Sequence, residues 1–143
     1  MKRLFTLLLF LGLGGAVTAA QLPWRDSWSE ARTEAERSGK NLMVFIEAEH
    51  CPYCERMKEE VLSDPDVVRS LKEFIPVRLN IDDPVVKKEF PGTSVTPTIY
   101  FITPRKKLLT DIVGYLNTEF FFWRLSAAER EAERLKRENK RSP

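Results

Sequence analysis

The feature that most constrains the fold is a buried strand that runs directly into a pair of cysteines. Residues Asn41–Glu47 (NLMVFIE) form a short apolar run between turn-forming residues. Such a run predicts a strand that is buried on both faces. A tight turn leads from it into the CPYC segment, Cys51–Cys54, and a charged stretch of helical character continues to about Leu62. This order places the first cysteine at the N-terminus of a helix.

The position at the helix start gives Cys51 a specific chemistry. Unpaired backbone N–H groups and the helix dipole favour an anion there, which lowers the pKa of a thiol and raises its thiolate fraction. Pro52 falls in the first turn, where its missing N–H costs nothing. Cys54 lies one helical turn further on, within reach of Cys51. The spacing therefore predicts thiol–disulfide exchange in which Cys51 attacks and Cys54 resolves the mixed disulfide.

Two other uses of the cysteine pair are open. A purely stabilising disulfide would close a very small loop and contribute only roughly 2 kcal/mol. A metal site would combine Cys51, Cys54 and His50 with Glu47 or Glu49, but adjacent His50 and Cys51 on a tight turn rarely aim at one ion. The histidine precedes the pair, so a c-type haem attachment motif is absent from the sequence. Exchange chemistry without a metal is the favoured interpretation.

The rest of the chain predicts one α/β domain. Strands separated by helices are expected to pair in parallel, and a terminal hairpin is expected to add an antiparallel edge. This predicts a mixed central sheet with flanking helices and a long C-terminal helix. The expected helices are Asp26–Ser38, Pro65–Lys72, a short one starting at Asp83, and one from Asn117 towards Asn139; the expected further strands are Ile75–Ile81, Thr98–Thr103 and Leu108–Val113.

The first twenty residues predict a signal peptide. Lys2 and Arg3 precede an apolar run, Leu4–Leu13, and small residues end at Ala20, where cleavage is expected. The alternative is an uncleaved membrane anchor facing the periplasm, although glycines weaken this segment as a span. The mature domain, residues 21–143, is expected in the periplasm or secreted, where disulfide chemistry is permitted.

Composition excludes several functional classes. The chain has 23 basic and 21 acidic residues, and removal of Lys2 and Arg3 leaves 21 of each. A neutral mature chain argues against nucleic-acid binding, which needs a basic excess. Two cysteines are too few for a disulfide-stapled miniprotein or a four-cysteine zinc site. The single histidine, His50, argues against a Ser-His-Asp hydrolase.

Two motifs resemble those of a known family. Phe45–Cys54 (FIEAEHCPYC) followed by Val95–Thr98 (VTPT) looks like a thioredoxin-fold thiol–disulfide oxidoreductase. The chain is most similar to exported bacterial thioredoxin-like proteins with a Cys-Pro-Tyr-Cys centre. The resemblance covers about Trp24–Leu125 and leaves about 126–140 as a helical extension. It implies that Pro97 is a cis-proline facing the sulfurs and that the Thr96 backbone pairs with a substrate strand.

The sequence also departs from the family. A cytoplasmic thioredoxin has a buried acid and a tryptophan where this chain has Phe45 and His50. Proton transfer to and from Cys54 therefore lacks its usual carboxylate, and Glu47 is the nearest substitute. A protonated His50 would stabilise the Cys51 thiolate, opposed by the acids beside it. Glu47 and His50 are thus candidate modulators of the thiol pKa beside the active-site dipeptide, Pro52 and Tyr53.

These observations predict an exported reductant of disulfides in periplasmic client proteins. The resemblance implies no tightly bound cofactor, because electrons arrive by thiol exchange, usually from a membrane thiol transporter. The alternatives are an oxidase or isomerase on the same fold, or a non-catalytic metal-binding or interaction module that uses Cys51 and Cys54. An apolar stripe in the last helix has coiled-coil spacing, but its two alanines favour a monomer over a dimer. That stripe comprises Phe121, Leu125, Ala128, Ala132 and Leu135.

Overall fold

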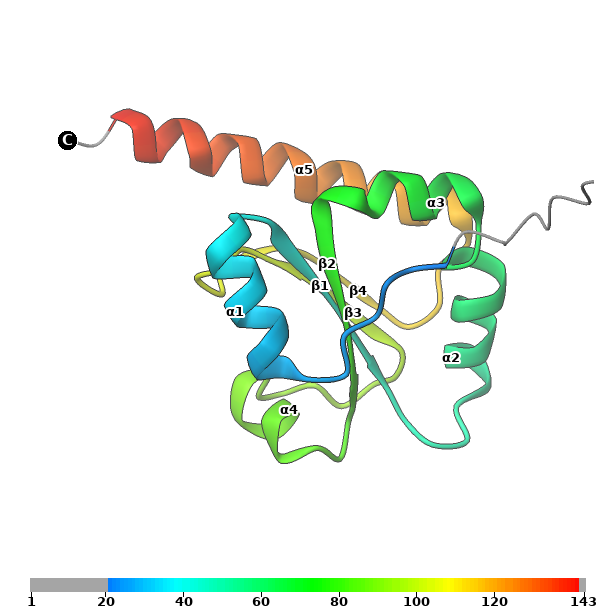
Figure 1. The fold of residues 1–143 in the computed structure, drawn as a ribbon. Helices are drawn as coiled ribbons and strands as arrows, with labels where there is room; N and C mark the ends of the chain where they lie inside the picture. Colours follow the sequence, from blue (N-terminus) through cyan, green and yellow to red (C-terminus); the bar gives the residue numbers. More distant parts are fainter. Residues whose placement is uncertain (1–20, 142–143) are drawn as a thin grey trace, which may run out of the picture.

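The computed structural model describes residues 21–141, so the predicted signal peptide lies outside the described residues. Helices cover both faces of a central sheet (Figure 1). The elements are α1 (Trp28–Ser38), β1 (Asn41–Glu47), α2 (Pro52–Arg56), the π-helical turn η1 (Met57–Val61), α3 (Pro65–Ser70), the 3₁₀ turn η2 (Leu71–Glu73), β2 (Phe74–Asn80), α4 (Pro84–Glu89), β3 (Thr98–Ile102), β4 (Leu108–Val113) and α5 (Thr118–Arg141).

Capping residues set the helix boundaries. The Ser27 side chain accepts a hydrogen bond from the Glu30 backbone N–H at the start of α1. Gly39 ends the same helix in the left-handed conformation, with φ 73°, which glycine adopts without steric cost. Asn117 Oδ1 accepts from the Phe120 N–H, at 3.0 Å, at the start of α5.

The sheet has the strand order β2-β1-β3-β4. β1 is parallel to β2, whereas β3 is antiparallel to both β1 and β4. The expectation of parallel pairing for strands separated by helices is therefore wrong for β3. The connection 81–97, which contains α4, begins and ends at the same end of the sheet, so β3 starts where β2 ends and runs in the opposite direction.

The sheet separates two apolar clusters. On one face, Phe45 and Phe101 pack with residues of the helices that follow the cysteines and of α5. On the other face, Val44 and Val77 pack with residues of α1 and α4. Consecutive residues of β1 thus point into opposite clusters, and residues 42–46 are fully buried. The predicted strand buried on both faces is confirmed.

The apolar stripe of α5 packs within the same chain. Its five residues are all buried, and all belong to the cluster that contains Phe45 and Phe101. A stripe occupied in this way cannot also serve as a coiled-coil seam. The core-facing contacts therefore continue past the expected limit at Leu125 as far as Leu135.

Neighbouring phenylalanines on α5 provide a test of this packing. Phe121 is fully buried, and its ring centroid lies 6.2 Å from that of Phe101, whereas Phe120 is 55% exposed. We expect Phe121→Ala to lower the free energy of unfolding by about 3–5 kcal/mol because it leaves a cavity. The control, Phe120→Ala, should change it by about 0.5 kcal/mol or less. Urea denaturation measures both, and equal losses would contradict the burial of α5.

Candidate active site

The two cysteines form a disulfide at the end of β1. A tight turn brings the chain from Glu47 to Cys51, which is the N-cap of α2, with Pro52 in the first turn. Cys51 and Cys54 are joined, and their Cα atoms lie 5.2 Å apart. Cys54 is fully buried, whereas Cys51 is partly exposed. An external sulfur compound therefore reaches Cys51 first.

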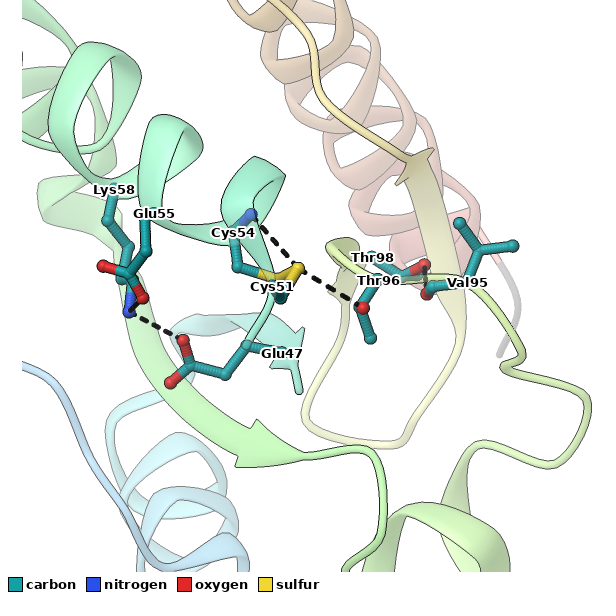
Figure 2. The surroundings of a disulfide bond; sticks show 8 residues. All are labelled: Glu47, Cys51, Cys54, Glu55, Lys58, Val95, Thr96 and Thr98. Atoms are coloured by element: carbon teal, nitrogen blue, oxygen red, sulfur yellow. Dashed lines mark hydrogen bonds and ion pairs between the residues drawn. A yellow bond between two sulfur atoms is a disulfide. The ribbon is translucent and has the colours of Figure 1, made fainter. Parts of the chain in front are cut away.

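Two hydrogen-bond donors point at the Cys51 sulfur (Figure 2). The Cys54 backbone N–H lies 3.2 Å from Cys51 Sγ, and the Thr96 hydroxyl lies 3.4 Å from it. Donors to a sulfur stabilise the negative charge that it carries after reduction. The sulfur at the helix start is therefore surrounded by groups that favour a thiolate.

The two motifs predicted from the sequence meet in space. The segment before β3 brings Thr96 to the disulfide, although 45 residues separate Thr96 from Cys51. The Thr96–Pro97 peptide bond is cis, and Pro97 is buried. The Pro97 carbonyl accepts a hydrogen bond from the Gly114 N–H at 2.8 Å, which attaches this segment to the end of β4.

Glu47 lies in a network of charges beside the disulfide. Its Oε2 is 2.8 Å from Lys58 Nζ, and its Oε1 is 3.6 Å from Arg78 Nε. Lys58 also pairs with Glu55, and Figure 2 shows both carboxylates directed towards its ammonium group. Burial opposes the charge on Lys58, but hydrogen bonds from Glu47 and Glu55 raise its pKa above the ordinary value. Sequence reasoning missed Lys58, whose only signal was a basic residue one turn after Cys54.

Phe45 and His50, which replace the acid and the tryptophan of a cytoplasmic thioredoxin, differ in solvent exposure. Phe45 is fully buried, and its ring centroid lies 5.8 Å from that of Trp24. His50 is exposed and adopts φ 53° in the turn before Cys51. Within residues 21–141, no hydrogen bond joins the His50 ring to either sulfur. Its effect on the thiolate therefore stays a prediction.

Among residues 21–141, no group of three or more histidine, cysteine, aspartate or glutamate side chains is placed to hold a metal ion. No helix in the same part of the chain has the length and apolar character needed to cross a membrane.

The Thr96 hydroxyl offers a direct test of the sulfur environment. We expect Thr96→Val to slow alkylation of reduced Cys51 by iodoacetamide at pH 7 about threefold, because one donor to the thiolate is lost. The midpoint of the alkylation pH profile should move to higher pH for the same reason. Thr33→Val, the same change on an exposed face of α1, is the matched control. An unchanged rate in Thr96→Val would show that this contact does not act on the thiolate.

Comparisons with known proteins agree with this geometry. The "Thioredoxin-like" family model matches residues 23–104. A thioredoxin from Thermus thermophilus is 30% identical, with a TM-score of 0.66, over 74% of this chain and 85% of that chain. The periplasmic thioredoxin SoxS from Paracoccus pantotrophus is 20% identical, with a TM-score of 0.54, over 65% and 99% of the two chains.

Curated relatives match over a similar region. Anterior gradient protein 3 from Xenopus tropicalis is 28% identical over 103 residues, which are 71% of this chain and 62% of that protein. The chain spans about three fifths of the length of the curated relatives that it matches. The family model, the thioredoxin likeness and the Cys51–Cys54 disulfide together show that the chain belongs to the thioredoxin-like family of thiol–disulfide oxidoreductases.

Proposed function

We propose that this protein reduces disulfides in exported client proteins by way of Cys51 and Cys54. The observation that carries the proposal is the asymmetry of the pair. Cys51 is partly exposed and accepts two hydrogen bonds at its sulfur, whereas Cys54 is fully buried one helical turn behind it. This arrangement suits an attacking thiolate and a protected resolving thiol.

The first step forms a mixed disulfide. Starting from the reduced pair, the Cys51 thiolate attacks one sulfur of the client disulfide. A bond forms between Cys51 and that sulfur, the client S–S bond breaks, and the other client sulfur leaves as a thiolate that takes a proton. We assign Thr96 and Pro97 to hold the client chain, because this segment lies against the attacking sulfur.

The second step releases the client. Cys54 loses its proton and attacks the Cys51 sulfur, which breaks the mixed disulfide and expels the second client sulfur as a thiol after protonation. Two electrons have then passed to the client, and the pair is left as the disulfide seen in the structure. A dithiol donor must reduce it before the next cycle.

Charged residues near the pair are proposed to tune these steps. Glu47, held by Lys58 and Arg78 at the end of β1, would supply negative charge near the sulfurs. His50, exposed in the turn before Cys51, would favour the thiolate when it is protonated. Pro52 and the exposed Tyr53 complete the surface that the client meets.

Location and partners form part of the same proposal. The predicted signal peptide over residues 1–20 and the likeness to a periplasmic thioredoxin support export, with cleavage near Ala20. We propose that a membrane thiol transporter supplies the electrons and that the protein acts as a monomer on protein disulfides. Occupation of the α5 stripe by the chain's own core supports the monomer.

Replacement of the cysteines tests the mechanism. We expect Cys51→Ser to abolish reduction of insulin disulfides by the mature protein, because no nucleophile remains. Cys54→Ser should accumulate mixed disulfides through Cys51, visible as adducts on non-reducing gels and by mass spectrometry. Both variants should keep the wild-type circular dichroism spectrum. Surviving activity in Cys51→Ser, or an absence of adducts in Cys54→Ser, would refute the assigned roles.

The reduction potential tests the direction of electron flow. Equilibration of Cys51–Cys54 with dithiothreitol or glutathione buffers should give a value near or below about −220 mV, as expected for a reductant. A value near about −120 mV would indicate a stabilised dithiol and a disulfide-forming oxidase. That result would reverse the proposed direction of electron flow but would leave Cys51 and Cys54 as the reacting residues.

A further inference from the structure

The loop between β4 and α5 contacts both parts of the site. At its start, the Gly114 N–H donates to the Pro97 carbonyl at 2.8 Å. One residue later, the Tyr115 hydroxyl donates to Glu60 Oε2 at 2.5 Å. Glu60 lies in η1, which continues directly from the helix that carries the cysteines. A two-residue segment therefore connects the Thr96–Pro97 segment to the cysteine helix.

Arg56 reinforces the contact between Tyr115 and Glu60. Its guanidinium lies 4.4 Å from the Tyr115 ring centroid, and it donates to both Glu60 oxygens at 3.1 and 3.2 Å. Hydrogen bonds from Arg56 and then from Tyr115 hold the pKa of Glu60 below its ordinary value. The acceptor is therefore ionised at neutral pH, and a hydrogen bond to an ionised acceptor is stronger than a neutral one.

These contacts complete a ring around the disulfide. Thr96 donates to Cys51 Sγ, Pro97 accepts from Gly114, and Tyr115 donates to Glu60 on the helical segment that follows Cys54. The sulfur and the Thr96–Pro97 segment are thus attached to each other on two sides. The Tyr115 contact adds to the pairing of Ile46 with Thr98 and to the hydrogen bond from the Thr118 hydroxyl to the Glu60 carbonyl, at 3.4 Å, which join the same elements.

We propose that Tyr115 is a positioning residue for the reduction of polypeptide disulfides. It holds the helix that carries Cys51 at a set distance from the segment that receives the client chain. This inference rests on the proposed function. Attack on a disulfide needs the three sulfurs nearly in line, so a client bound at Thr96 reacts fast only when Cys51 is held relative to it. A small disulfide reagent is not bound at Thr96, so its reaction rate does not depend on the position of Cys51 relative to that segment.

Two variants separate positioning from a general effect. Tyr115→Phe keeps the ring and removes the hydroxyl, and Glu60→Gln removes the charge from the acceptor. We expect each to lower kcat/KM for insulin disulfide reduction about tenfold. The rate at which reduced Cys51 reacts with 5,5′-dithiobis(2-nitrobenzoic acid) should stay within about twofold of wild type, because this reagent needs only the thiolate.

The control is Glu133→Gln, the same substitution at an exposed glutamate that pairs with Lys136 on the distant part of α5. It should change neither rate. The proposal is overturned if insulin reduction is unchanged in both site variants, or if both rates fall together. If wild-type protein reacts with the small reagent but reduces no insulin, the proposed function itself fails. Thermal unfolding of each variant confirms that it is folded.

Discussion

The structure depends on the burial of β1 between β2 and β3. Every residue from Leu42 to Ile46 is fully buried, and the side chains alternate between two clusters that different helices cover. Because this strand is paired on both sides, its end has a defined position in the molecule. The turn that follows starts from that position, which places Cys51 at the beginning of a helix and at the edge of the protein.

The site combines two segments that are distant in sequence. The chain leaves β1 with the cysteines and returns at Thr96 and Pro97 only after β2 and α4. The connection 81–97, which contains α4, begins and ends at one end of the sheet, so β3 starts where β1 stops. The antiparallel placement of β3 is thus what brings the Thr96 hydroxyl to the Cys51 sulfur.

Local patterns predicted much of the molecule. The apolar run before the cysteines, the helix start at Asn117 and the hairpin 98–113 depend on neighbours in sequence, so local patterns predict them. The predicted direction of β3 was wrong, because the direction in which a strand pairs depends on residues that are distant in sequence. The stripe of α5 was recognisable as apolar, but spacing alone cannot distinguish a partner helix from the chain's own sheet.

Residue types and short spacings were enough to predict the chemistry: a cysteine pair at a helix start, a proline motif downstream and a nearly neutral mature chain. These are matters of residue type and short spacing. The identity of the side chains around the sulfurs depends on the packing of the whole domain. Lys58 meets Glu47 because a helix packs beside the end of a strand, and Tyr115 meets Glu60 across 55 residues. Such contacts depend on how elements pack in three dimensions, and no local pattern encodes them.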